Sequence, residues 1–450
     1  MIRNYFFCLL FAVLILISVL AVNAQGGENY LSLPKEVPGN YEGKWYGLWI
    51  PASMFSREEF KGRPRGNGFP DQKIINSWGY KAKPIEEIKD LLPETYYDIC
   101  ANPEQWGEIR INESPFIPLD QWPGLNQKLF KEATERNKGK AKIDARGQLV
   151  NYENGAPFPG TTNAVEMAWN FIFGQSAAPT TYCPNYGSVT DRKGTTSYLR
   201  SVQTFFSMKG RFRGEHVPRW EPNPNNYLWF NAQPFTRPYD FRGIVPLVLR
   251  YDDPEKQDDQ WMYLPVLRRV RRMSTTQRWD KMPGGLDMTY DSAGGFQGKV
   301  QNYDWKILGP QVLLCVRIAK DEIQENKGKV GGCGVDELYQ RVNTVVLQYI
   351  PKIVSTASRG VIYIDPGTYV VYYCEIFDKR GRKYLFSNYT WSVDKDGVPQ
   401  PCSIFCTDIQ RIHGGSTCGV CQATNDDAEK EGVSPSFFEM NSLQSRYGSR

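Results

Sequence analysis

The sequence predicts a mostly β protein with a few helices, an α+β fold in which antiparallel strands dominate. Aromatic residues make up 14% of the 450 residues, and aromatic and β-branched residues favour strands. From residue 196 onward, apolar side chains recur at every second position, which is the period of a strand with one buried face. The 40 glycines and 30 prolines favour long, turn-rich connections between these strands.

The first 24 residues have the pattern of a secretory signal peptide. Arg3 supplies the positive charge, residues 6–22 form an uncharged apolar run, and Val22-Asn-Ala24 provides a small-residue cleavage site. We expect cleavage after Ala24 and export of the remaining chain; an uncleaved N-terminal anchor is the alternative. The net charge of +5 is too small to favour nucleic acid as a partner.

Residues 25–150 contain few periodic segments, and we interpret them as an extended arm with short helices. Two helices are predicted in it, at residues 84–92 and 125–137, because apolar residues share one face of each. A third helix is predicted to begin at Thr162 or Asn163 and to end near Phe173, with Glu166 placed as in a capping box. This third helix has little polar surface, so we expect it to be buried against a sheet.

Period-two patterns predict a series of strands that follow one another as in an antiparallel meander. The predicted strands are residues 198–213, 226–233, 243–251, 260–273, 298–308, 312–319, 345–354, 360–364, 368–377 and 382–393. A hairpin turn that ends on glycine is predicted at residues 378–381. Residues 423–450 are polar and poor in aliphatic side chains, which is typical of a disordered tail.

Cysteines concentrate in residues 401–422, in the spacing of two pairs. In an exported protein the expected state is the disulfide, although an odd number of cysteines outside the signal peptide leaves at least one thiol over. The disulfide candidates are Cys402, Cys406, Cys418, Cys421, Cys100 and Cys183. A zinc site that includes His413 and a redox pair at Cys418-Gly-Val-Cys421 are the alternatives.

Four arginines lie within a strand-like stretch of aromatic and aliphatic residues, where charge is normally sparse. They are Arg268, Arg269, Arg271 and Arg272. If residues 266–273 form a strand, arginines project from both faces, so neither face is wholly dry. One interpretation is a solvated strand that pairs with the acidic turn at residues 252–259. A second is a cationic lining for a carboxylate, a phosphate or a partner protein; a third, a nucleic-acid patch, lacks a surrounding basic field.

The stretch that begins at Trp261, Trp-Met-Tyr-Leu-Pro-Val-Leu-Arg-Arg-Val-Arg-Arg, resembles the central motif of a family of exported bacterial proteins. That family is known only as a domain of unknown function, and its fold is related to the periplasmic lipoprotein carriers and outer-membrane lipoprotein receptors of the Lol pathway. Further similar elements are Gly155-Ala-Pro-Phe-Pro, Glu166-Met-Ala-Trp-Asn, Gly285-Leu-Asp-Met-Thr-Tyr-Asp, Tyr303-Asp-Trp-Lys and residues 372–381. The chain departs from the family at Pro265-Val-Leu, where the pattern has Pro-Gly-Gln, and in the cysteine segment.

The resemblance covers about residues 150–400 and implies a strongly curved antiparallel sheet. This sheet would form an incomplete barrel that helices plug on one side, with an apolar cavity between. The resemblance also implies a periplasmic location and an association with the outer membrane. The expected layout is a signal peptide (1–24), an arm (25–150), a lipoprotein-carrier-like half-barrel (151–400), a cysteine-rich segment (401–422) and a tail (423–450). The candidate binding residues are Trp261, Tyr263, Arg268, Arg269, Arg271, Arg272, Tyr303 and Trp305.

The sequence offers little for catalysis. Only two histidines occur, His216 and His413, and neither a nucleophile elbow nor a phosphate-binding loop is present. We therefore expect no cofactor, no metal and no enzymatic activity. The predicted function is a carrier for a lipid or acyl chain, with arginines at the rim of its cavity. The alternatives are an interaction protein that docks an outer-membrane barrel or an inner-membrane exporter, and a hydrolase whose carboxylates local spacing does not reveal.

Overall fold

The computed structural model describes residues 81–116, 128–175, 178–214, 216–273, 278–317, 319, 329–330, 336–393, 399–419, 423–424, 428–429 and 432–447. The expected signal peptide and the part of the arm that precedes residue 81 lie outside these residues. Within the described part of the chain, no helix has both the length and the apolar character that crossing a membrane requires.

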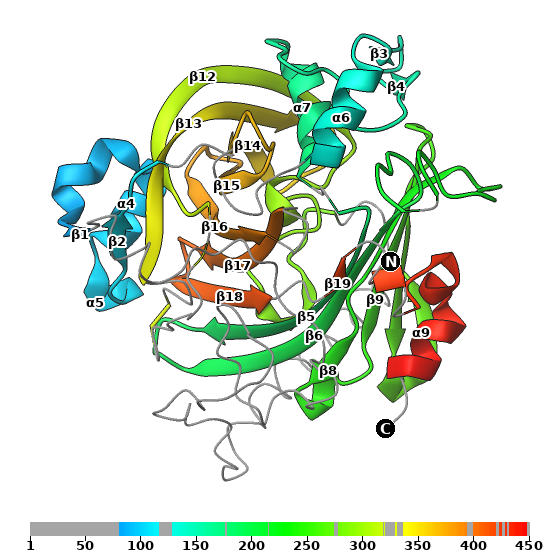
Figure 1. Cartoon of the computed structure of the whole chain (residues 1–450). Helices are drawn as coiled ribbons and strands as arrows, with labels where there is room; N and C mark the ends of the chain where they lie inside the picture. The colour runs from blue at the N-terminus through cyan, green and yellow to red at the C-terminus, as the bar shows by residue number, and fades with distance from the viewer. Residues whose placement is uncertain are drawn as a thin grey trace, which may run out of the picture.

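Most strands belong to one long, strongly curved antiparallel sheet (Figure 1). From one edge to the other, the strands pair in the order β11 (Arg269–Arg272), β10 (Asp259–Leu264), β9 (Val245–Tyr251), β7 (Tyr227–Ala232), β6 (Thr196–Ser207), β5 (Thr180–Thr190), β18 (His413–Gly419), β17 (Pro399–Asp408), β16 (Lys383–Val393), β15 (Val371–Asp378), β14 (Ala357–Ile364), β13 (Asp336–Pro351) and β12 (Tyr303–Cys315). Among the described residues, β11 and β12 each pair on one side only, so the sheet does not close into a barrel. The expected incomplete barrel is confirmed.

Shorter strands extend this sheet or stand beside it. β8 (Phe235–Arg237) pairs with β6, β19 (Ala423–Thr424) pairs with β5, β2 (Arg110–Glu113) pairs in parallel with the start of β13, and β1 (Lys81–Lys83) pairs with β2. β3 (Lys142–Ile143) and β4 (Leu149–Val150) form a separate two-stranded sheet. The predicted turn at residues 378–381 joins β15 to β16, and its amide at Gly381 donates to the carbonyl of Asp378.

Two predictions about where strands are interrupted are wrong, and proline accounts for one of them. Residues 260–273 form a hairpin rather than one strand, because Pro265 cannot donate to a ladder and Arg268 turns the chain with a φ of +48°. Conversely, the predicted break between residues 308 and 312 does not exist. The strand β12 continues through it with an irregularity at Gly309, whose φ is +127° and which a glycine adopts without strain.

The cysteine-rich segment is part of the half-barrel, which corrects the expected boundary at residue 400. It supplies most of β17 and all of β18, which bridge β16 and β5. Glycine permits close packing here, because a Cβ on Gly414 would lie 2.5 Å from the carbonyl oxygen of Val330. Cys402 and Cys406 are small buried side chains of β17, which is a common use of the residue.

Three disulfide candidates are therefore wrong. Cys100, Cys402 and Cys406 are buried and are not disulfide-bonded, and burial raises the pKa of the Cys406 thiol to about 12. Cys183 is disulfide-bonded. Cys421 and the side chain of Cys418 lie outside the described residues, and the predictions for them stay predictions.

The third predicted helix is present as α7 (Ala164–Gly174) and begins where the sequence indicates. The side chain of Asn163 accepts from the backbone N–H groups of Val165 and Glu166, at 2.9 and 3.2 Å, which satisfies two unpaired donors. As expected, the helix is buried, with Phe171 at 0% exposure. It approaches its neighbour closely, because a Cβ on Gly174 would lie 2.5 Å from the Cβ of Tyr369.

The described part of the arm contains short helices, as expected. They are a 3-10 helix (Ile85–Leu91), α4 (Glu94–Cys100), α5 (Pro103–Trp106) and α6 (Lys128–Asn137). Their apolar side chains belong to the main core, and the hydroxyl of Tyr96 on α4 lies 2.8 Å from that of Tyr339 on β13. α4 and α5 thus lie beside β13 and β16, whereas α6 lies in another place, at the top of the view (Figure 1).

The C-terminal segment is ordered in its described part, which corrects the prediction of a disordered tail. A 3-10 helix (Pro435–Phe438) and α9 (Met440–Tyr447) pack on the outside of the sheet beside β9 and β7 (Figure 1). Phe437, Phe438 and Leu443 are buried there at 1%, 3% and 0% exposure. Three large apolar side chains are enough to anchor a segment whose average composition is polar.

Candidate functional site

A pocket lies between α7 and the face of β6, β7 and β9 that is turned away from α9. We call this face the inner face. The volume of the pocket is about 550 Å³ when the open space at its mouth is counted. The lining residues are Ile172, Phe173, Gln175, Pro179, Phe205, Ser207, Lys209, Gly210, Phe212, Leu228, Trp229, Arg250, Phe296 and Gln297. The pocket therefore sits where a helix covers the curved sheet, which is the expected position of a cavity in this fold.

Strand alternation builds the apolar wall of the pocket. Phe205 and Phe206 are neighbours on β6 and point to opposite faces. Phe206 packs under the C-terminal segment, with its ring 6.2 Å from that of Phe438. Phe205 instead faces the pocket and lies 5.6 Å from the ring of Trp229 on β7. The guanidinium of Arg250 lies 4.5 Å from the Trp229 ring and covers one end of this wall.

The polar groups of the pocket are partly committed to other contacts. The Nζ atom of Lys209 lies 2.6 Å from an Oδ2 oxygen of Asp252 and 2.5 Å from Oδ1 of Asn226. The side-chain amide of Gln175 donates to the carbonyl oxygen of Phe296 at 3.4 Å. The charge of Lys209 is therefore balanced, and the pocket presents mainly apolar surface with a few hydrogen-bonding groups.

A buried network of charges lies beside the pocket and connects the regions near the two edge strands of the sheet. Arg250 on β9 and Arg278 both donate to Oδ2 of Asp258, each at 2.8 Å. Arg278 also donates to Asp291, which in turn accepts from the hydroxyl of Tyr303. Because Tyr303 is the first residue of β12, this network runs from near one open edge of the sheet to the other. We call it the seam network.

The seam network also holds the chain between β11 and β12 in place. The carbonyl oxygen of Gln297 accepts from both Arg250 and Arg278, at 2.8 and 3.0 Å, and that of Gly298 accepts from Arg250 at 3.1 Å. Burial alone would raise the pKa of Asp258, but the two guanidinium groups outweigh burial and hold that pKa below its usual value. The charged state of this buried carboxylate is therefore stable.

A lysine at the margin of this network is less well compensated. The Nζ atom of Lys299 lies 4.0 Å from Asp258 and donates to the carbonyl oxygen of Asp253 at 2.7 Å. Burial lowers the pKa of Lys299 to about 8, with Asp258 opposing that shift and the neighbouring guanidinium groups adding to it. Lys299 is thus the cation of the cluster that loses its proton first as pH rises.

A second cluster of charges links residues 281–287, which lie between β11 and β12, to β17 and β18. The Nζ atom of Lys281 lies 2.6 Å from Asp287 and 2.6 Å from Asp408, and Nδ1 of His413 lies 2.5 Å from Asp287. Each of the two carboxylates thus has a cationic partner, which favours a structural role over a catalytic one. In the described part of the chain, no group of three or more His, Cys, Asp or Glu side chains is arranged to hold a metal ion.

The structure separates the predicted binding residues into three places. Trp261 and Tyr263 lie half-buried on the outer side of the sheet, beside the C-terminal segment. Tyr303 and Trp305 lie inside, packed around Phe296 in the main core. The four arginines are exposed on the β10–β11 hairpin.

None of these eight residues lines the pocket described above. One arginine of the hairpin pairs with the acidic turn, as the interpretation of a solvated strand predicts. Arg272 donates to the carboxylate of Asp259 at 2.6 Å and lies over the ring of Trp261, 5.6 Å from its centroid. The pairing with the acidic turn at residues 252–259 is therefore real, but it involves the last residue of that turn. Asp258, one position earlier, belongs to the interior.

Sequence reasoning missed Arg250, Asp258 and Arg278. The sequence places Asp258 in the acidic turn at residues 252–259, where four aspartates cluster within eight residues. A usable signal was Arg250 itself, which is a single charge at the end of the apolar strand Val-Pro-Leu-Val-Leu-Arg-Tyr. A charge in such a strand requires a buried partner. The identity of that partner depends on long-range folding and is not visible in local spacing.

The family of the chain is established by comparison. The model of the family described as "Protein of unknown function (DUF1329)" matches residues 85–444. The chain therefore belongs to this family, and the resemblance to an uncharacterised family is confirmed. An uncharacterized protein of Pseudomonas aeruginosa, PA3922, is 30% identical over 193 residues, which are 41% of this chain and 40% of that protein. The match thus spans about two fifths of the length of this curated relative.

Solved structures with a similar course of the chain include two bacterial proteins. One is a putative outer membrane lipoprotein-sorting protein domain from Vibrio parahaemolyticus, with 15% identity, a TM-score of 0.46, and coverage of 62% of this chain and 98% of that one. The other is a DUF1329 family protein from Desulfovibrio piger, with 17% identity, a TM-score of 0.44, and coverage of 62% and 97%.

Proposed function

We propose that this protein is a non-enzymatic, exported binding protein that carries a hydrophobic ligand, a lipid or an acyl chain, in the pocket between α7 and the inner face of the sheet. The observation that supports the proposal most directly is the pocket itself. Its wall is formed by aromatic and aliphatic side chains from α7, β6 and β7. Each methylene group of an acyl chain buried against such a wall contributes about 0.8 kcal/mol.

The size and polarity of the pocket fit one chain better than a large ligand. The cavity volume without the solvent at its mouth is only about 40 Å³, well below the roughly 300–1,000 Å³ of drug-sized sites, so the pocket suits one narrow chain that lies partly in its open mouth. Gln175, Ser207 and Lys209 interrupt the apolar wall and offer donors to an ester carbonyl or a head group. The polar end of the ligand would lie at these residues, and the acyl chain would lie along Phe205 and Trp229.

The proposed location is the periplasm, with service to the outer membrane. The support is the signal-like start of the sequence and the description of the Vibrio neighbour as a putative outer membrane lipoprotein-sorting protein domain. A periplasmic carrier must shield acyl chains from water, and a half-barrel covered by a helix provides such a shield.

Native mass spectrometry of protein purified without detergent tests the proposal. We expect a lipid adduct on the wild-type chain, either retained from the cell or acquired from added phospholipid. Ser207→Trp places a large side chain in the pocket, so it should abolish the adduct. Ser197→Trp is the matched control, because Ser197 lies on the same strand and is exposed. An unliganded wild-type mass after incubation with lipid, or an adduct unaffected by Ser207→Trp, would contradict the proposal.

A further inference from the structure

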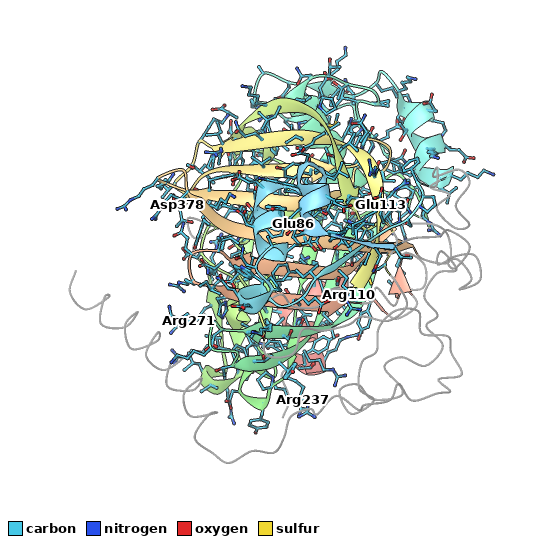
Figure 2. The ribbon with its side chains drawn as sticks, turned by 90° about the vertical axis from the view of Figure 1, so that its left-hand side faces the viewer. Glu86, Arg110, Glu113, Arg237, Arg271 and Asp378 are labelled. Carbon is cyan, nitrogen blue, oxygen red and sulfur yellow. The ribbon has the colours of Figure 1, made fainter. Side chains whose placement is uncertain are left out.

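The register of the sheet brings three connections to one end of it, away from the pocket. Val245, which follows the β8–β9 loop, pairs with Tyr263, which precedes the β10–β11 turn. Arg237 on β8 pairs with Arg200, near the start of β6 and its turn from β5. These connections are residues 191–195, 237–244 and 265–272, and we call them together the basic end. Figure 2 shows Arg237 and Arg271 at this same end of the molecule.

The basic end holds as much net charge as the whole chain. Its three segments contain eight arginines and lysines against two aspartates, and Asp259, the partner of Arg272, lowers their net charge from +6 to +5. The 450 residues together also have +5. The cations are Arg192, Lys193, Arg237, Arg242, Arg268, Arg269, Arg271 and Arg272, and all of them are exposed. The carboxylate of Asp191 already accepts from the backbone amides of its own turn. The positive field is therefore concentrated at one end.

Apolar side chains protrude between these cations. Val266 is 90% exposed and Leu267 is 42% exposed, both in the β10–β11 turn, and Tyr239 is 74% exposed in the β8–β9 loop. All three stand on turns or loops between strands. Aliphatic and aromatic side chains flanked by arginines suit the interface of a bilayer, where the apolar part enters the head-group region and the cations meet phosphates.

We propose that the basic end docks the protein onto an anionic lipid bilayer, with Val266, Leu267 and Tyr239 inserted and the surrounding arginines on lipid phosphates. A bilayer is favoured over a protein partner because the exposed residues of these turns are mainly cations, with single exposed apolar side chains among them. The inference does not depend on the pocket. Arg200, which pairs with Arg237 of the basic end, and Ser207, which lines the pocket, are seven residues apart on β6, roughly 23 Å at about 3.3 Å per residue, so either site works without the other.

Vesicle co-sedimentation tests the docking. Vesicles of phosphatidylcholine alone are compared with vesicles that also contain phosphatidylglycerol, at low and at high salt. We expect binding only to the anionic vesicles and its loss at high salt. Arg268→Gln together with Arg269→Gln should weaken it by roughly tenfold or more. The matched control is Lys379→Gln with Arg380→Gln, an exposed pair in the β15–β16 turn, which should bind like the wild type.

Insertion is measured at single sites with a polarity-sensitive fluorophore. Val266→Cys labelled with such a dye should report an apolar environment on anionic vesicles. Val354→Cys is the control, because Val354 is 85% exposed at a distant turn, and its dye should stay in water. Equal binding to both vesicle types, an equal loss in both paired variants, or an unchanged signal at Val266 would overturn the proposal. Retention by outer-membrane proteins without vesicle binding would also overturn it, in favour of a protein partner.

Discussion

Arg250 and Asp258 form a nearly fully buried ion pair, with side chains only 4% and 3% exposed and a contact of 2.8 Å. The pair stands at the centre of the seam network, since Asp258 also accepts from Arg278. Removal of one partner from a buried pair leaves an uncompensated charge in a poorly solvated site. The pair therefore anchors the β9–β10 hairpin to the chain between β11 and β12, which Asp258 contacts through Arg278.

Asp258→Asn should destabilise the protein by about 3–5 kcal/mol, because two guanidinium groups would lose their shared counter-charge. The free energy of urea-induced unfolding measures this. Asp252→Asn is the control, because Asp252 lies at the surface end of the same connection and pairs with Lys209 alone. A loss for Asp258→Asn no larger than that of the control would show that the network is not a stabilising element.

Lys299 should make stability depend on alkaline pH. Burial lowers its pKa to about 8, while an unfolded lysine has a pKa of about 10.4. Between these values the unfolded chain binds more protons than the folded one, so stability contributed by this site rises with pH. We expect the unfolding free energy of the wild type to rise relative to that of Lys299→Met from pH 8 to pH 10, by an amount on the order of 1–2 kcal/mol. Parallel curves for the two proteins would contradict the argument.

Gly360→Ala should destabilise the half-barrel through lack of space. A Cβ at this position would lie 2.2 Å from Cζ of Tyr349, and Tyr349 is fully buried with its hydroxyl donating to the carbonyl oxygen of Gly295 at 3.0 Å. Overpacking of this kind costs roughly 1–3 kcal/mol. Thermal unfolding measures the effect. Tyr349→Leu should reduce the additional cost of Gly360→Ala, and strict additivity of the two changes would argue against a steric cause.

Asn170→Leu should loosen the helix that covers the pocket. The Asn170 side chain accepts from the amide of Phe158 at 2.8 Å and donates to its carbonyl oxygen at 2.7 Å, so it fixes the Gly-Ala-Pro-Phe-Pro loop to α7. The backbone N–H and C=O groups of Phe158 would both lose their hydrogen-bond partner, and each loss would cost about 1–3 kcal/mol. Chemical unfolding and hydrogen exchange in α7 measure the result. Asn163→Ala is the comparison, since it removes the helix cap for about 1 kcal/mol without releasing the loop.

Phe438→Ala should show that the C-terminal segment is anchored. Phe438 is 3% exposed and its ring lies 5.4 Å from that of Phe230 on β7. Truncation of a buried phenylalanine costs about 3–5 kcal/mol when the segment is part of the cooperative core. Limited proteolysis should then cleave residues 432–447 first. Ser445→Ala, at an exposed position of α9, is the control, and equal resistance of both variants would restore the interpretation of a loosely attached tail.

The sequence predicted the class of fold and much of its order, because local signals carried them. Asn163 capped the helix that its position indicated, and the turn at residues 378–381 formed as its glycine required. β17 and β18 were missed because cysteine spacing suggested a separate segment, although Cys406 simply fills a sheet position. A strand that contains Gly309-Pro310 also contradicts the usual meaning of that dipeptide.

The candidate site was less predictable, because it is made by contacts between distant residues. The pocket combines Phe173, Phe205, Trp229 and Phe296, which no local pattern connects. The motif residues themselves were well chosen as marks of the family, yet Tyr303 stabilises the seam through Asp291 and does not reach the pocket. A motif identifies residues that a fold requires, and binding surfaces are often assembled elsewhere.

The two free edges, β11 and β12, give this half-barrel a mechanical freedom that a closed barrel lacks. A closed barrel changes its girth only when whole strands slide past one another and exchange their ladder hydrogen bonds. Here the gap is spanned by contacts of Asp258 with Arg278 and of Arg250 with the carbonyl oxygens of Gln297 and Gly298, so the sheet can widen by breaking these contacts while every backbone ladder stays intact. Such a molecule behaves like a split ring, whose opening is set by a few polar contacts rather than by strand register.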